Sequence, residues 1–532
     1  MVTPSPVADG AVTVDAVKPI RSWRMPPAPR WCLPILGLLT VATFAAGLLG
    51  GFVLDDQRAI LEHPVVRGAV PVTQAFTRTF WGAPLGSHPP SYRPVATLSF
   101  ALDHALFGPS PLAFHLVSLA WYLGLMGAAW VFARRCMSPL AAFAALAFFA
   151  TMPVHVENVT SLVGRADTLG VLASVLVLLT LSPFILDGSK AARGRIPAAM
   201  LLFLLGLLAK ESIAILPVVV GLFIESVRRK SAGTRSFPRA HLPTAALFAT
   251  LGMYLGARLL AQPDTFTYVP PDDVLVGAGW LTKLGYGCER LAGYARLIMA
   301  PVDLCTGKKY AEVARPEGLS LSLLAGLGLV VLAIALSARA RRKGALPLVP
   351  SAFAAWFLIS GLPFTMPESM ADRFLLLPTF FLCLATGPAL SAFGEKGRIR
   401  RGLLLLALAV QSLLAAAQTR TWRNDDTLLS HAVAVCPDSV HNHFRYAEHL
   451  SDQGHPSQAL WHFAVASQGA SAFPRPWTHP AKEAEWSLPI ETRLRQMHQL
   501  LQVPLDETIW RQRFRNYLVR QGRNREAALL GP

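Results

Sequence analysis

Residues 31–56 read WCLPILGLLTVATFAAGLLGGFVLDD, an apolar run that ends in two adjacent acids, Asp55 and Asp56. The hydrocarbon core of a bilayer is about 30 Å thick and needs roughly 20 predominantly apolar residues in a spanning helix. The run over 31–53 is therefore predicted to cross a membrane, and both carboxyl groups are predicted to lie at its exit.

Similar runs recur along the chain and predict an all-α, polytopic membrane protein of about eleven transmembrane helices. The runs at 197–209 and 212–227 are short, and we interpret them as half-spanning helices joined at a polar tip, Lys210-Glu211, within a cavity of the protein. The predicted spans are 31–53, 112–133, 138–153, 168–187, 197–209, 212–227, 243–261, 318–338, 346–363, 373–393 and 402–418.

Composition narrows the class of protein. The chain has 532 residues, a mean hydropathy of +0.41 and a formal net charge of +17, but only 15% charged residues, against about 25% in ordinary soluble domains. Soluble proteins that bind nucleic acid are basic and also dense in charge. We therefore expect no nucleic-acid partner and look for the basic residues in the loops of a membrane protein.

The basic clusters share one side of the predicted topology. With residues 1–30 as a cytoplasmic N-terminal segment and an uncleaved first helix, the threading puts every cluster in the cytoplasm, and these segments account for the whole net charge, as the positive-inside rule requires. The clusters comprise Lys18, Arg21, Arg24 and Arg30; Arg134-Arg135; Lys190, Arg193 and Arg195; Arg228-Arg229-Lys230, Arg235 and Arg239; Arg339, Arg341, Arg342 and Lys343; and Lys396, Arg398, Arg400 and Arg401.

The opposite, non-cytoplasmic face is predicted to carry long loops at 54–111 and 262–317 and the tail 419–532. Within the second loop, residues 280–300 form an amphipathic pattern that favours a helix lying on the membrane surface. Three cysteines, Cys288, Cys305 and Cys436, fall on this face. A disulfide among them is allowed in an oxidising compartment, but their spacing does not pair them.

The tail differs in composition from the membrane domain at 31–418. Residues 439–468, SVHNHFRYAEHLSDQGHPSQALWHFAVASQ, match the helix-turn-helix pattern of one tetratricopeptide unit, with small residues at Ala447, Gly454, Ala459 and Ala466. Because a single repeat cannot bury its own face, we expect it to stack on helices predicted at 482–501 and 506–528 or on the membrane domain. A small helical cap without a ligand is the alternative.

Ionisable residues gather on the non-cytoplasmic side. Adjacent acids such as Asp55 and Asp56 repel each other and lose hydration, which makes one of them a base, or they bind a divalent cation; a plain helix-end cap is the alternative. Charges at membrane edges usually face a cavity, a partner or the headgroups, and several on one side favour a shared site. The others are Arg93, His155, Glu157, Arg165, Asp167, Lys210, Glu211 and Arg373.

Five segments precede the tetratricopeptide-like tail in this order: FVLDDQRAI (52–60), RPVATLSFALDHALFGPSPLAFH (93–115), PVHVENVTSLVGRADTLG (153–170), LLAKESIAILPVVV (207–220) and ADRFLLLPTF (371–380). Together with the tail they resemble the transmembrane and tetratricopeptide repeat protein O-mannosyltransferases, which are lipid-dependent glycosyltransferases of the GT-C class. The chain departs from that family in showing about one tetratricopeptide unit where typical members carry many.

The resemblance implies a GT-C-like membrane domain that transfers a sugar, usually mannose, from a polyprenyl-phosphate carrier to a Ser or Thr hydroxyl of an acceptor protein. An attacking hydroxyl needs a carboxylate base, and the resemblance makes Asp55 the first choice, with Asp56 as orienting partner or ligand of a divalent cation, Mg²⁺ or Mn²⁺. The departing lipid phosphate needs cations. Arg93, Arg165 and Arg373 are the candidates, and His155, Glu157, Asp167, Lys210 and Glu211 would line the pocket.

Two other classes of function fit some of these features. A multi-span transporter also carries intramembrane charges, but the chain shows no internal repeat and its charges gather at one face rather than at the midplane. A membrane-anchored tetratricopeptide scaffold gives Asp55 and Asp56 no role. We therefore expect a glycosyltransferase that is a multi-pass protein of a bacterial inner membrane, with a cytoplasmic N-terminus and a periplasmic C-terminus.

Overall fold

The computed structural model confirms an all-α chain. It describes residues 27–87, 90–186, 190–230, 240–265, 279–307, 320–363, 370–437, 439–455, 458–463 and 465–466. In these ranges the regular structure is helical, apart from isolated bridge residues such as the antiparallel pair Arg78 and Pro84.

Seven helices among the described residues are long and apolar enough to cross a membrane. The chain is therefore an integral, multi-pass membrane protein, as predicted. The spanning segments are α1 (Cys32–Phe44) with its 3₁₀ extension η1 (Ala45–Leu49), α3 (Pro111–Cys136), α6 (Arg165–Ile185), α9 (Leu242–Ala261), α11 (Leu321–Arg342), α13 (Leu376–Glu395) and α14 (Arg398–Thr421).

An eighth crossing is bent. Helix α4 (Pro139–Thr151) and the turn after it, which contains α5 (Val156–Thr160), meet at an angle of 60° across Met152. Proline at position 153 has no N–H to continue the ladder of α4. Counted as one span, this pair brings the described crossings to eight, and the predicted count of eleven stays a prediction.

The remaining predicted spans form short helices inside the bundle. Helices α7 (Ile196–Ala209), α8 (Leu216–Lys230) and α12 (Leu348–Ile359) have 14, 15 and 12 residues. At 1.5 Å per residue the longest reaches about 22 Å, less than the hydrocarbon core. The helical path breaks at Lys210, which is extended, and resumes as η7 (Glu211–Ile215), so the predicted polar tip is a real interruption between two half-length helices.

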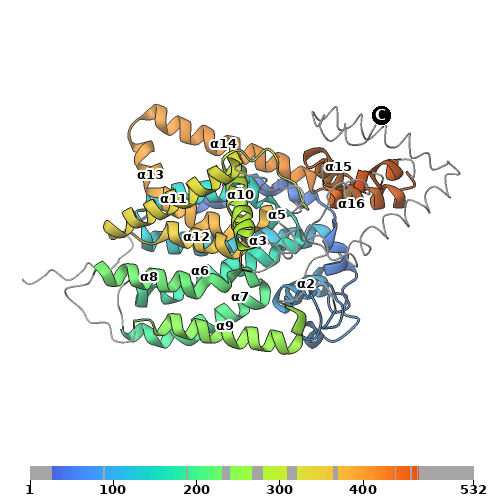
Figure 1. Ribbon diagram of the computed structural model, residues 1–532, viewed down its shortest axis with the longest axis horizontal. Helices are drawn as coiled ribbons and strands as arrows, with labels where there is room; N and C mark the ends of the chain where they lie inside the picture. Colours follow the sequence, from blue (N-terminus) through green and yellow to red (C-terminus); the bar gives the residue numbers. More distant parts are fainter. Residues whose placement is uncertain are drawn as a thin grey trace, which may run out of the picture.

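Helix α10 (Trp280–Met299) runs across the direction of the other helices (Figure 1). Its composition excludes it from the candidate spans. One face is buried and includes Arg290 and Tyr294, whereas Trp280 and Met299 at its two ends are exposed. This orientation agrees with the helix predicted to lie on the membrane surface.

One end of the bundle carries both the first long loop and the start of the tail (Figure 1). The loop contains the π-helical turn η2 (Gln57–Leu61), the 3₁₀ turn η3 (Val72–Phe76) and helix α2 (Pro94–Phe107). Apolar side chains of η2 and α2 belong to a small separate core beside the main one, and Ala75 of η3 packs in a second small cluster with Ala101 of α2. The Asp55-Asp56 pair and the tail are thus neighbours in space although they are far apart in sequence.

The tail begins with α15 (Asp425–Val435) and α16 (Val440–Asp452), and further helical residues follow at 458–463. Ala447, Ala459 and Ala466 are fully buried, and Gly454 adopts a left-handed φ of 76° in the turn, as the tetratricopeptide pattern predicts. The helices predicted at 482–501 and 506–528, and most of segment 1–30, lie outside the described residues.

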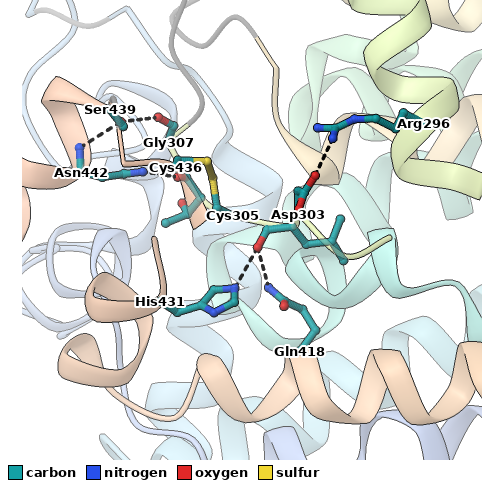
Figure 2. The surroundings of a disulfide bond; sticks show 11 residues. Arg296, Asp303, Cys305, Gly307, Gln418, His431, Cys436, Ser439 and Asn442 are labelled. Carbon is teal, nitrogen blue, oxygen red and sulfur yellow. Dashed lines mark hydrogen bonds and ion pairs between the residues drawn. A yellow bond between two sulfur atoms is a disulfide. The ribbon is translucent and has the colours of Figure 1, made fainter. Parts of the chain in front are cut away.

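A disulfide joins the tail to the membrane domain. Cys305, just after α10, is bonded to Cys436, which follows α15 (Figure 2). Next to it the Leu304 carbonyl accepts hydrogen bonds from Gln418 Nε2 at 3.2 Å and His431 Nε2 at 3.0 Å. The sequence left the pairing open, and the structure excludes Cys288, which is a buried thiol. The loop after α10 and the tail therefore lie on the same side of the membrane.

This bonding predicts a thiol count. Denatured without a reductant, the protein exposes four thiols to an alkylating reagent, those of Cys32, Cys136, Cys288 and Cys383, and six after reduction. Mass spectrometry of alkylated, membrane-extracted protein measures both numbers. Cys305→Ser serves as the control, because it releases Cys436 and leaves five thiols without any reductant. Six thiols in the unreduced wild type would contradict the Cys305–Cys436 disulfide.

Candidate active site

The loop after η1 places Asp55 and Asp56 differently. Asp56 is fully buried, and its two oxygens accept the backbone N–H groups of Val53 and Val163, both at 3.1 Å. Asp55 is half-buried. Leu54, immediately before the pair, has φ +45°, which is rare for a residue with a branched side chain. The local backbone therefore turns the two carboxyl groups in different directions.

The environment of Asp56 favours its protonated form. Burial raises the pKa of this carboxyl to about 7; the hydrogen bonds from Val53 and Val163 oppose the rise, and the negative charges of Asp55 and Asp425 add to it. The group therefore changes charge near neutral pH. Of the pair, Asp55 is the carboxyl that a substrate can reach.

The partners of Asp56 bear on its predicted role as a cation ligand. Each of its oxygens accepts a backbone N–H, and the described residues bring together no cluster of three or more His, Cys, Asp or Glu side chains able to hold a metal ion. A divalent cation at Asp56 stays a prediction of the sequence.

Arg165 has a protein partner on each of its three side-chain nitrogens, and its role in phosphate binding stays a prediction. Its side chain is fully buried, with Nε donating to Ser118 Oγ at 2.9 Å and Nη2 to the Phe114 carbonyl at 2.8 Å, while Nη1 pairs with Asp103. The guanidinium also lies over the Phe100 ring, 4.6 Å from its centroid. With these partners and no exposure, it holds α2 and α3 against the start of α6.

His155 also has protein partners on both ring nitrogens, and its place in the pocket lining stays a prediction. It is fully buried, with Nε2 2.8 Å from Thr379 Oγ1 and Nδ1 2.9 Å from the Phe149 carbonyl. The Tyr122 hydroxyl lies 3.1 Å from the same Nδ1. These contacts tie the bend after α4 to α13 and α3.

The other six predicted residues form three acid–base pairs. Lys210 Nζ lies 2.8 Å from Asp167 Oδ2, Arg93 Nη2 lies 3.0 Å from Glu211 Oε1, and Arg373 pairs with Glu157. The charges of Lys210, Arg93 and Arg373 act on one another, so the pairs belong to one cluster. It is assembled from residues at the starts of α2 and α6, from α5, from η7 and from η10 (Asp372–Leu375).

Exposure separates the cations of this cluster. The side chains of Arg93 and Arg373 are 16% and 18% exposed, whereas that of Lys210 is 4% exposed. Phe374 packs beside two of them, with its ring centroid 5.8 Å from Lys210 Nζ and 5.2 Å from Arg373 Cζ. The two arginines are therefore the accessible cations of this cluster, whereas Lys210 is buried.

Two residues missed by the sequence reasoning belong to this region. Asp425 accepts the N–H of Leu54 at 2.8 Å. Arg258, in the last turn of α9, donates to the Tyr254 hydroxyl at 2.8 Å and the Pro90 carbonyl at 3.0 Å, and its charge acts on Glu211. The signals were present: Asp425 belongs to a second Asp-Asp pair directly after a span, and Arg258 is a lone cation inside an apolar run.

Residues 87–255 match the family model of the dolichyl-phosphate-mannose-protein mannosyltransferases. The match includes Arg93, the 153–170 segment and the Lys210-Glu211 tip. The resemblance to the protein O-mannosyltransferases is confirmed. Asp55, Asp56 and Arg373 lie outside the matched stretch.

Curated relatives extend the likeness over most of the chain. Protein O-mannosyl-transferase F38B6.6 of Caenorhabditis elegans is 25% identical over 441 residues, which cover 79% of this chain and 60% of that protein. Protein O-mannosyl-transferase TMTC4 of Homo sapiens is 24% identical over 488 residues, 82% of this chain and 66% of its own. The chain thus spans less than two thirds of the length of these protein O-mannosyltransferases.

One solved structure is similar in outline. ArnT from Cupriavidus metallidurans bound to undecaprenyl phosphate aligns with a TM-score of 0.42 and 14% identity over 88% of this chain and 77% of its own.

Gly164 precedes Arg165 at a point where the backbone leaves no room for a side chain. A Cβ added there would lie 2.3 Å from the Glu157 carbonyl oxygen. Gly164→Ala is expected to lower the free energy of unfolding by about 1–3 kcal/mol, as overpacking does, measured by thermal unfolding in detergent. Gly127→Ala on α3 is the control, because a Cβ there meets nothing within 4 Å. Equal stability of the two variants would contradict the close approach of Gly164 to the Glu157 carbonyl.

The raised pKa of Asp56 predicts a pH-dependent stability. The unfolded chain loses this proton near pH 4, but the folded protein keeps it until about pH 7, so the contribution of Asp56 to stability falls as pH rises between these values. Asp56→Asn cannot lose the proton. The melting temperature of this variant relative to wild type should therefore increase from pH 4.5 to 7 and level off above pH 7.5. A difference that does not vary with pH would contradict the shift.

Proposed function

We propose that the chain is an integral-membrane glycosyltransferase that moves mannose from a polyprenyl-phosphate carrier to a Ser or Thr hydroxyl of a protein. The observation that carries the proposal is the charged cluster containing Arg93 and Arg373, built largely from the segment that matches the mannosyltransferase model. That family is described by a dolichyl-phosphate-mannose donor and a protein acceptor, and the relatives are named as protein O-mannosyl-transferases.

Asp55 is proposed as the general base. Its half-buried carboxyl is the accessible member of the pair, and a Ser or Thr hydroxyl is too weak a nucleophile to attack without losing its proton. As the hydroxyl oxygen bonds to the anomeric carbon, Asp55 takes the proton and the bond from that carbon to the phosphate oxygen breaks. Attack opposite the departing phosphate inverts the anomeric centre. Asp56 holds the loop in place through the hydrogen bonds that it accepts from Val53 and Val163.

Arg93 and Arg373 are proposed to bind the leaving phosphate. The electron pair of the broken bond passes to the phosphate oxygen, and planar guanidinium groups are suited to that charge because they donate two parallel hydrogen bonds. Each arginine holds a glutamate, Glu211 or Glu157, in the ligand-free arrangement. These carboxylates keep both guanidinium groups oriented and partly exposed until a phosphate arrives.

The proposed location is a bacterial inner membrane with the site and the C-terminus in the periplasm. Two observations support it: the Cys305–Cys436 disulfide requires an oxidising compartment, and the basic clusters favour the opposite, cytoplasmic side. A carrier held in the bilayer presents its phosphate at headgroup level, next to loops that emerge from the spans.

Replacing Asp55 by Asn is expected to lower transfer about 10²–10⁴-fold, because that is the usual contribution of general-base catalysis and Asn cannot accept the proton. The assay incubates purified protein with mannosyl polyprenyl phosphate and a Ser/Thr-rich acceptor, and measures donor consumption and acceptor mass. Glu62→Gln is the control, because Glu62 is an exposed acid of the same loop whose side chain bonds that of Gln57.

Undiminished transfer by the Asp55→Asn variant would contradict the proposed base. A wild-type protein that consumes no mannosyl carrier, but moves a solute across proteoliposomes, would replace the glycosyltransferase by the transporter alternative.

A further inference from the structure

The junction between α14 and α15 lies directly on the loop that carries Asp55. Gly51 N donates to the Arg423 carbonyl at 2.9 Å, and Leu54 N donates to Asp425 Oδ1 at 2.8 Å. A Cβ on Gly50 would come within 3.2 Å of the Trp422 carbonyl. The start of the tail thus contacts the backbone of this loop at three successive points.

Leu54 is the one non-glycine residue with positive φ, +45°, in the part of the chain that the structure describes. Such a conformation is unfavourable for a leucine, so surrounding contacts must hold it. The following residue is Asp55, whose direction depends on the ψ of Leu54. The backbone N–H of this strained residue donates its hydrogen bond to a side chain, that of Asp425.

Asp425 is itself held firmly. It is the first residue of α15, whose start is closed by a capping box between Asn424 and Thr427, and a carboxylate in the first turn is stabilised by the positive end of the helix dipole. The far end of the same helix leads to Cys436, which is bonded to Cys305. Helix α15 is therefore anchored to the membrane domain at both ends.

We infer that Asp425 is a positioning residue for the proposed transfer: it holds Leu54 in the left-handed conformation and thereby aims Asp55 at the acceptor hydroxyl. The inference rests on the proposed function. It gives the first helix of the tail a part in the catalytic step, in addition to any part the tail plays in binding the acceptor.

The neighbouring Asp426 provides a matched control. It lies in the same helical turn, but its side chain is 64% exposed, and its Oδ1 lies 4.0 Å from His449 Nε2. Asp426→Ala therefore removes a carboxylate from α15 without touching Leu54. Asp425→Asn keeps an oxygen at the position of Oδ1, whereas Asp425→Ala removes the acceptor.

The test compares kcat and KM for the mannosyl carrier in these three variants. For Asp425→Ala we expect a fall of about 100-fold in kcat, the order expected from a misplaced catalytic group, with KM within twofold of wild type. Asp425→Asn should stay within about threefold of wild type in kcat, and Asp426→Ala should be unchanged. Equal kcat in Asp425→Ala and Asp426→Ala would overturn the inference, as would a fall confined to KM.

A second substitution tests the link through Leu54. Glycine adopts positive φ at no steric cost, so Leu54→Gly in the Asp425→Ala background should recover at least about tenfold of the lost kcat. The same change in wild type should lower kcat or leave it unchanged. Additive losses in the double variant would overturn the link between Asp425 and the conformation of Leu54.

Hydrogen exchange separates this inference from the proposed function. Asp425→Ala should speed amide exchange in peptides covering residues 50–60 at least tenfold, and Asp426→Ala should not. If wild type transfers no mannose but this difference appears, the proposed function fails and the contact stands. If wild type transfers mannose and the exchange rates of the two variants are equal, Asp425 does not hold the loop and the inference fails.

Discussion

The structure depends on one buried carboxylate that bridges two backbone segments. Asp56 accepts N–H groups from Val53, just after the first span, and from Val163, just before α6. These are donors that apolar surroundings would otherwise leave unsatisfied, at a cost of about 1–3 kcal/mol each. By pairing both, Asp56 places the exit of the first helix beside the start of α6, and Asp55 and the charged residues of α6 become parts of one region.

The same requirement explains the ion pairs around that bridge. An isolated charge in apolar surroundings is costly, and removing one partner of a buried pair typically destabilises a protein by about 3–5 kcal/mol. Each cation is therefore matched: Arg165 by Asp103, Lys210 by Asp167 and Arg373 by Glu157. Arg165 is fully buried, whereas Arg93 and Arg373 are partly exposed. In the proposed function these two arginines exchange a glutamate for an anionic ligand.

Sequence reasoning found what local pattern determines and missed what distant contacts determine. The long spans, such as α3 and α6, followed from apolar runs, and the interruption at Lys210 followed from a polar pair within one. The sequence did not show which of Arg93, Arg165 and Arg373 is buried. Burial depends on contacts between residues that are far apart in the chain, such as those of Arg165 with Phe114 and Ser118. The disulfide partner of Cys305 and the role of Asp425 were hidden for the same reason: both are set by how the tail packs.

We propose that the mannosyl carrier binds with its phosphate at Arg93 and Arg373 and its sugar beside Asp55. The most direct measurement is a structure of the protein with a non-transferable phosphonate analogue of mannosyl polyprenyl phosphate. We expect phosphonate oxygens within hydrogen-bond distance of at least one of these two guanidinium groups, and the anomeric carbon facing the Asp55 carboxyl. A phosphonate bound at Arg228 and Arg229, in the last turn of α8, would contradict this placement.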